Sequence, residues 1–228
     1  MSQNPKTNEL IELLAKDSAT TAGENEIRKR GLGFSAFARF WIVGAVLIAA
    51  LSVWLLPTRE DLGDRLTHAD SFLLFLLWSA ATLFSTFRVY SLAFPDLRLK
   101  APFDRFSKFA GLPLALIALF TIARFTFTDL GFQFFRESSY LNGGCGMVIL
   151  VAGSLHASIL FTWMRRGATT APFEAGAWAA VSTASLASFI VQFACANENP
   201  IHVLLWHFAP LLILTGIAGL AAKRLLRW

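Results

Sequence analysis

The sequence predicts an all-α, polytopic membrane protein of six transmembrane helices, with its amino-terminal tail and its carboxy-terminus in the cytoplasm. Three observations predict this class. The 228-residue chain is 55% hydrophobic and only 15% charged, whereas about a quarter of a soluble domain is charged. The apolar residues form blocks of about 18 residues, which is enough to cross a ~30 Å hydrocarbon core as a helix. The strand-like alternation of a membrane barrel is absent.

Six apolar blocks are the predicted spans of a transmembrane domain that covers residues 40–222. They are residues 40–56, 71–94, 111–128, 147–164, 175–196 and 201–222. Pro210 lies inside the last block and should bend that helix. In the fifth block small residues recur every four positions, at Gly176, Ala180, Ala184 and Ser188. This spacing predicts a central helix that its neighbours approach closely.

The basic residues predict the orientation, because lysine and arginine stay on the cytoplasmic side of a membrane. With the tail inside, fifteen basic residues fall in cytoplasmic segments, including the basic end at residues 223–228, and three fall in outer loops. Arg88 and Arg124 lie within predicted spans. We expect both to snorkel toward the surface and Arg124 to pair with Asp129.

The cytoplasmic tail, residues 1–39, contains one segment with a helix signature, residues 4–17. An asparagine and a proline open it as cap and first-turn residue. Its four apolar residues and the acidic residue at its end are Leu10, Ile11, Leu13, Leu14 and Asp17. So short a helix folds when its apolar stripe enters a groove on a partner, and the alternative is a solvated, disordered tail. Residues 18–27 have the composition of a linker.

The two cysteines, Cys145 and Cys195, begin the fourth predicted span and end the fifth. Both should therefore lie at the outer face, where adjacent antiparallel helices bring their ends together. The pair can serve as a structural disulfide, a redox switch or two soft metal ligands. With His202 and His68 on the same face, a thiolate–imidazole metal site is a further possibility.

Other features narrow the expected function. Glycines flank Cys145 and predict an accessible sulfur, while His156 and His207 lie deeper and should hydrogen-bond to neighbouring helices. The sequence has no P-loop, no Gly-x-Ser-x-Gly and no His-Glu-x-x-His motif, and neither cysteine belongs to a Cys-x-x-Cys pair. We therefore expect no enzyme and no cofactor.

Two stretches carry a family resemblance. Residues 7–17 read Thr-Asn-Glu-Leu-Ile-Glu-Leu-Leu-Ala-Lys-Asp, and residues 195–207 read Cys-Ala-Asn-Glu-Asn-Pro-Ile-His-Val-Leu-Leu-Trp-His, with Lys-Arg-Leu-Leu-Arg-Trp at the end. The chain resembles the NrsF family of bacterial integral-membrane anti-sigma factors, negative regulators of an extracytoplasmic-function sigma factor of the SigF type. The resemblance covers nearly the whole chain, but the middle matches mainly in hydropathy and in Cys145.

The resemblance implies a mechanism. The apolar stripe at residues 10–14 would hold the sigma factor at the inner membrane, away from core RNA polymerase, with no direct contact between this chain and nucleic acid. Cys145 and Cys195 would sense an oxidant or a thiol-reactive metal from outside. Such a change would alter helix packing and release the sigma factor.

Three other functions remain open from the residues alone. A transporter or metal-handling protein that uses the outer cysteines and histidines predicts bound metal or flux and no need for residues 1–27. A membrane thiol oxidoreductase predicts a quinone or thioredoxin-like partner. A purely structural disulfide predicts that Cys145→Ser lowers stability by roughly 2–4 kcal/mol without switching any output.

Overall fold

The computed structural model describes residues 34–56, 59–93, 107–127, 143–166, 169–195, 197 and 199–226, so the predicted tail segment 4–17 lies outside the described residues. Residues 1–38 and 39–228 form separate units, and the packing below concerns the second. All regular structure in the described part is helical: α3 (Phe34–Leu55), α4 (Leu62–Arg65), α5 (Ala69–Ala93), α7 (Leu112–Phe127), α9 (Gly144–Met164), α10 (Pro172–Val191), α11 (Pro200–His202), the π-helix η3 (Val203–Phe208) and α12 (Ala209–Leu225).

Five of these helical segments are long and apolar enough to cross a membrane: most of α3, then α5, α9 and α10, and the continuous run Pro200–Leu225. They coincide with five of the six predicted blocks. The remaining block corresponds to α7, whose 16 residues extend about 24 Å at 1.5 Å per residue. The all-α class is confirmed and five apolar helices are consistent with a membrane protein, while the six-span count and the orientation stay predictions.

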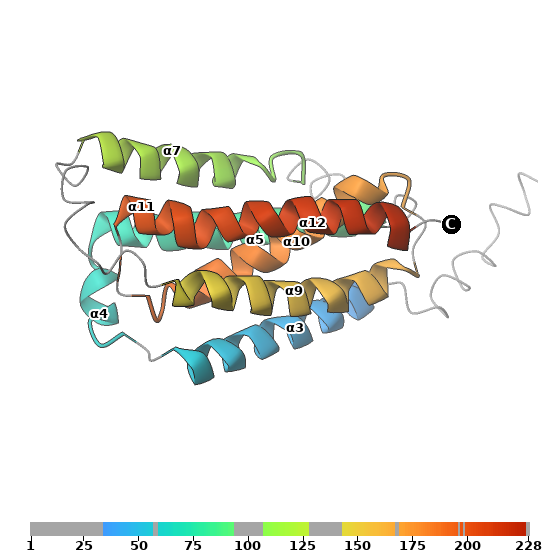
Figure 1. The fold of residues 1–228 in the computed structure, drawn as a ribbon, viewed down its shortest axis with the longest axis horizontal. Coiled ribbons are helices and arrows are strands. Elements are labelled where there is room, and N and C mark those ends of the chain that lie inside the picture. Colours follow the sequence, from blue (N-terminus) through green and yellow to red (C-terminus); the bar gives the residue numbers. More distant parts are fainter. Residues whose placement is uncertain are drawn as a thin grey trace, which may run out of the picture. The chain divides into compact units, whose positions relative to one another are not determined.

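The centre of the bundle is α10, which packs against α12, α5 and α9 (Figure 1). Of the residues in its apolar window, 72% are buried inside the protein, against 39% for α5. The small-residue stripe makes this possible, since Ala180 and Ala184 are fully covered. A Cβ atom on Gly176 would overlap the Cβ atom of Ala222 and lie 2.6 Å from the carbonyl oxygen of Ala218. The predicted central position of this helix is confirmed.

One group of polar side chains within the bundle joins three helices by hydrogen bonds. The hydroxyl of Ser182 on α10 accepts a hydrogen bond from the indole N–H of Trp41 on α3 at 3.3 Å and lies 2.7 Å from the hydroxyl of Thr86 on α5. In an apolar surrounding an unpaired hydroxyl is costly. This contact therefore ties three helices together at one level.

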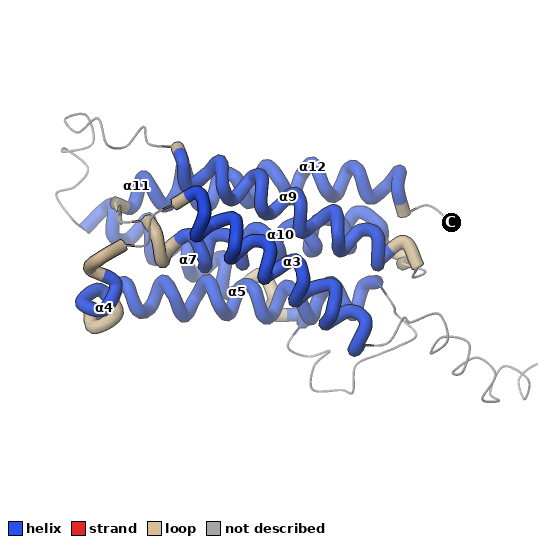
Figure 2. Tube along the Cα trace, turned by 90° about the horizontal axis from the view of Figure 1, so that it is seen from below, coloured by secondary structure: helices blue, strands red, loops and turns tan. Residues whose placement is uncertain are grey.

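Ion pairs mark the two ends of the bundle. Arg124, near the end of α7, lies 3.1 Å from Asp70 at the start of α5, and Arg88, near the end of α5, lies 3.5 Å from Glu174 at the start of α10. Both neighbours of α5 therefore run antiparallel to it. Figure 2 shows the long helices of the bundle lying side by side. The expected partner of Arg124, Asp129, lies outside the described residues, and the observed one is Asp70.

The last apolar block is not one regular α-helix. The amide of Ala209 donates to the carbonyl of Leu204, five residues back, and Pro210 follows in the first turn of α12. A proline has no N–H to donate to the preceding turn. The disturbance that the sequence predicted at Pro210 thus takes the form of a π-helical stretch directly before it.

Candidate metal and thiol site at one end of the bundle

The two cysteines meet at the end of the bundle that also carries Asp70. Cys145 is the second residue of α9, and Cys195 closes the short turn that follows α10. Both are free thiols with 9% of their surface exposed. The prediction that adjacent helix ends bring the two cysteines close together is therefore confirmed.

The sulfur of Cys145 is not accessible, contrary to the expectation from its flanking glycines. The ring of Trp206 packs onto the start of α9, where a Cβ atom on either Gly143 or Gly146 would lie 2.8 Å from a ring carbon. The glycines are needed for close packing of an aromatic side chain. They help to bury the cysteine, which the sequence alone did not reveal.

Two histidines complete the cluster from the beginning of the last span. The side chain of Asn199 caps α11 by accepting a hydrogen bond from the amide of Ile201 at 2.9 Å, and Pro200 suits the first helical position. This start fixes His202, whose Nε2 atom lies 3.3 Å from the sulfur of Cys195. The ring of His207 is 5.7 Å from that of His202, centroid to centroid.

The π-helix explains why His202 and His207 point the same way. In an α-helix, residues five apart differ by about 140° around the axis, because each turn holds 3.6 residues. In η3 the hydrogen bonds run between residues five apart, so such residues lie on about the same face. Two histidines with the His-x₄-His spacing therefore lie on the same face only where the helix is locally a π-helix.

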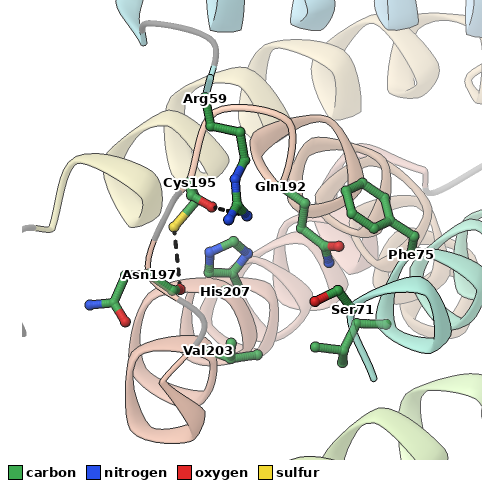
Figure 3. A pocket seen from close by; sticks show the side chains of 9 residues that line it. Arg59, Ser71, Phe75, Gln192, Cys195, Asn197, Val203 and His207 are labelled. Carbon is green, nitrogen blue, oxygen red and sulfur yellow. Dashed lines mark hydrogen bonds between the residues drawn. The ribbon is translucent and has the colours of Figure 1, made fainter. Parts of the chain in front are cut away.

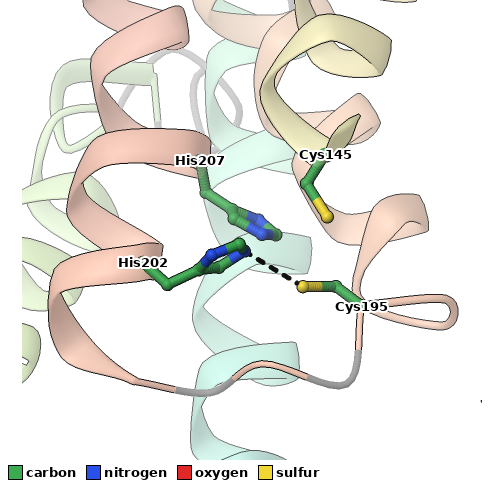
Figure 4. Close-up of side chains that lie close together, drawn as sticks. All are labelled: Cys145, Cys195, His202 and His207. Carbon is green, nitrogen blue, oxygen red and sulfur yellow. Dashed lines mark hydrogen bonds between the residues drawn. The ribbon is translucent and has the colours of Figure 1, made fainter. Parts of the chain in front are cut away.

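One ligand atom from each of Cys145, Cys195, His202 and His207 lies within 4.8 Å of the others, and all four residues are buried. Figure 4 shows the two thiols and two imidazoles pointing toward a common centre. The Nδ1 atom of His202 and both ring nitrogens of His207 have no hydrogen-bond partner among the described residues. The cluster is therefore a buried group of soft and borderline donors with unused valences.

His68, which the sequence offered as a fourth ligand, is not in this cluster. Its side chain is 57% exposed and lies 3.7 Å from the carboxylate of Asp64. His207, assigned from sequence to helix packing, takes the fourth position instead. The signal for His207 was its distance of five residues from His202, which has meaning only in a π-helix.

A clamp from the first loop holds the turn that carries Cys195. The amide of Arg59 donates to the carbonyl of Phe193 at 3.1 Å, and its guanidinium donates to the carbonyl of Cys195 at 3.0 Å. Asp61 accepts two hydrogen bonds from the same guanidinium, at 2.7 and 2.9 Å. The hydrogen bonds from Arg59 lower the pKa of the Asp61 carboxyl well below its usual range, so the carboxylate stays ionised and offsets the charge of this buried arginine.

A small cavity of about 20 Å³ lies beside the cluster, enough for roughly one water-sized species. Figure 3 shows Arg59, Cys195 and His207 around it. Its lining residues are Arg59, Ser71, Leu74, Phe75, Gln192, Cys195, Asn197, Val203 and His207. The interaction of the Cys195 sulfur with the Cys145 thiol, together with a hydrogen bond from His202, lowers the pKa of Cys195, although burial acts in the opposite direction.

The fold and this cluster define an all-helical protein with five helices long and apolar enough to cross a membrane, and with two thiols and two imidazoles gathered at one end. The family model of NrsF, described as negative regulator of sigma F, matches residues 22–228. The chain belongs to this family, and it is accordingly a negative regulator of a sigma factor, in other words an anti-sigma factor. Neither the curated proteins nor the solved structures gave a match to the chain.

Proposed function

We propose that this chain holds an extracytoplasmic-function sigma factor at the bacterial inner membrane and releases it when its two cysteines react with an oxidant or a thiol-reactive metal. The observation that carries the proposal is the meeting of Cys145 and Cys195 at one end of a bundle in a member of an anti-sigma family. The tail and the carboxy-terminus then lie in the cytoplasm, and the cysteines face the periplasm.

Binding of the sigma factor is assigned to the tail. The stripe of Leu10, Ile11, Leu13 and Leu14, followed by Asp17, has the spacing of a helix that enters an apolar groove. The family match begins at residue 22, after this stripe, so the assignment rests on the pattern of the stripe itself. Residues 1–27 carry more acidic than basic residues, which favours a basic partner surface over an anionic lipid surface.

Sensing is assigned to the cysteines. When hydrogen peroxide oxidises the two thiols, the thiols lose two hydrogen atoms and form one S–S bond. The peroxide is reduced to two molecules of water. A thiol-reactive cation such as Cd²⁺ instead binds both sulfurs in place of the protons, or of the metal ion, that they carry. Either reaction pulls the start of α9 toward the turn that follows α10. The helix α10 is the central helix of the bundle. Because α10 packs against three other helices, a shift there can bias a two-state arrangement along the whole bundle.

The test is a pull-down of tagged full-length chain from native membranes, compared with a variant that lacks residues 2–27. We expect a sigma factor with the full chain and none with the deletion, as identified by mass spectrometry. Exposure to peroxide or Cd²⁺ before solubilisation should empty the full-length chain but leave a Cys145→Ser, Cys195→Ser double variant loaded. A sigma factor retained by the deletion variant would contradict the role of the tail.

The alternative is a metal-handling or transport protein, which the cluster of thiols and imidazoles favours. It predicts metal flux across vesicle membranes that depends on Cys145, Cys195 and the histidines. It also predicts that deletion of residues 2–27 leaves this flux unchanged. The absence of any sigma factor in both pull-downs, together with such flux, would move the assignment to this alternative.

A further inference from the structure

We propose that Cys145, Cys195, His202 and His207 form a tetrahedral binding site for a borderline-soft divalent metal ion of the Zn²⁺ type. Their ligand atoms all lie within 4.8 Å of one another. In a tetrahedral Zn²⁺ site the ligand atoms are roughly 3.3–3.8 Å apart, as follows from Zn–N and Zn–S bonds of about 2.0–2.3 Å. The pair formed by Cys195 and His202, at 3.3 Å, already has this separation.

Unused imidazole nitrogens are a second, independent observation. His202 and His207 are each only 2% exposed. Three of their four ring nitrogens lack a hydrogen-bond partner among the described residues. Buried polar atoms are nearly always paired, because leaving them unpaired loses their interaction with water without replacement. A metal ion at the common centre bonds one nitrogen of each ring and so pairs one of the two nitrogens of His207 that have no partner among the described residues.

The charges also fit a divalent cation. Binding displaces the two thiol protons, so the two thiolates offset the double positive charge of the ion. Arg59, a buried cation that bonds to the Cys195 carbonyl, is offset by Asp61, which accepts two hydrogen bonds from it. The occupied site is therefore neutral overall, which a buried position requires.

The donor set selects the class of metal. Two thiolates and two imidazoles suit Zn²⁺ and related ions, whereas Ca²⁺ and Mg²⁺ prefer oxygen ligands. For the proposed sensor this site supplies a resting state in which both cysteines are already engaged. Only that link rests on the proposed function, because the metal site stands on the four residues alone.

The first experiment uses the full-length wild-type chain, purified in detergent without reducing agent or chelator, from cells grown with added Zn²⁺. Elemental analysis should give about one zinc ion per chain. X-ray absorption at the zinc edge should show two sulfur ligands at about 2.3 Å and two nitrogen ligands at about 2.0–2.1 Å. Substoichiometric zinc, or zinc bound by oxygen and nitrogen only, would overturn the proposal without any need for a variant.

The second experiment compares His207→Gln with His68→Gln, since the sequence suggested His68 and the structure selects His207. His207→Gln should weaken zinc binding by more than the roughly 10–100-fold that loss of an outer-shell partner costs. His68→Gln should leave the affinity unchanged. Equal effects of the two substitutions would overturn the ligand set. Zinc binding and sigma capture are separate readouts, so failure of one does not imply failure of the other.

Discussion

Arg59 decides how firmly the Cys195 turn is held. Its side chain is 3% exposed. Its guanidinium donates a hydrogen bond to the carbonyl of Cys195, which is 136 residues away in the sequence. Such a charge-assisted bond is stronger than a neutral one. The Asp61 carboxylate contributes to stability at any pH above its ordinary pKa, and this contribution is lost only as the pH falls through the lowered value of the folded state. The clamp is therefore closed at neutral pH.

We expect Arg59→Gln to speed the reaction of Cys195 with a membrane-impermeant maleimide by about tenfold or more. A hydrogen bond to a charged group contributes about 1.5–3 kcal/mol, and its loss lets the turn open more often. The measurement is the labelling rate in a Cys145→Ser background, where Cys195 is the only cysteine.

The matched control is Arg65→Gln. Arg65 also hydrogen-bonds to Asp61, at 3.3 Å, but its side chain is 38% exposed. An exposed ion pair contributes little, so the labelling rate should stay close to that of the parent. If Arg59→Gln gives the rate of this control, the clamp does not guard the cysteine.

At the scale of the element, α10 and η3 show two ways in which a helix serves the site. In α10 the small residues let α12 approach until no side chain fits between them. In η3 one wide turn aligns two histidines that a regular α-helix would separate. The close approach to α10 is visible in the sequence as a four-residue repeat of small residues. The alignment of the histidines is not visible there, because it depends on where the extra residue of the π-turn falls.

We expect Gly176→Ala to destabilise the bundle by about 1–3 kcal/mol, the range for an extra carbon in a well-packed core. The new methyl group would overlap the Cβ atom of Ala222 and press on the backbone of Ala218. The measurement is the free energy of unfolding in mixed micelles as the mole fraction of denaturing detergent rises.

Gly216→Ala on α12 provides the comparison, because a Cβ atom there meets nothing within 4 Å. Alanine is the better helix former, so this substitution should be neutral or slightly stabilising. A Gly216→Ala variant that is destabilised as much as Gly176→Ala would mean that the loss does not come from the contact between α10 and α12.

At the scale of the molecule, α7 determines the number of spans. α5 leads away from the end that carries the cysteines, and α9 begins again at that end. The ion pair between Arg124 and Asp70 shows that α7 runs back along α5 in the opposite direction. Its length of about 24 Å is a few ångströms less than a ~30 Å hydrocarbon core, a mismatch that local thinning of the bilayer can accommodate.

We therefore expect reporter fusions to alternate in location along the chain. Fusions of green fluorescent protein after Lys108, Arg166 and Arg224 should fluoresce, since these positions are predicted to be cytoplasmic. Fusions of alkaline phosphatase after Arg65 and Asn197 should be active, since these positions are predicted to be periplasmic. An active phosphatase after Lys108 would show that the six-span arrangement with the tail inside is wrong.

Much of the fold and of the candidate site could be predicted from the sequence, and the predictions that were wrong share one cause. The repeat of small residues in α10 marked the central helix, and the positions of Cys145 and Cys195 at span ends marked the pair. His68 was predicted as a metal ligand because it lies near the same membrane face as the cysteines. Many residues lie at one face, however, and only a few of them point toward one common position. Accessibility of Cys145 was inferred from its flanking glycines, but Trp206, which packs against Gly143 and Gly146, comes much later in the chain.

The sequence by itself determined the all-helical class, most of the helix positions and the end of the bundle where the cysteines meet. These follow from hydropathy and spacing, which act over a few turns of one helix and need no knowledge of neighbours. Only the tertiary structure decided that His207 and not His68 joins the cluster, that Arg59 clamps the Cys195 turn and that Arg124 pairs with Asp70. Each of these depends on the rotation of one helix about its axis against another, and that rotation is set by packing between distant residues.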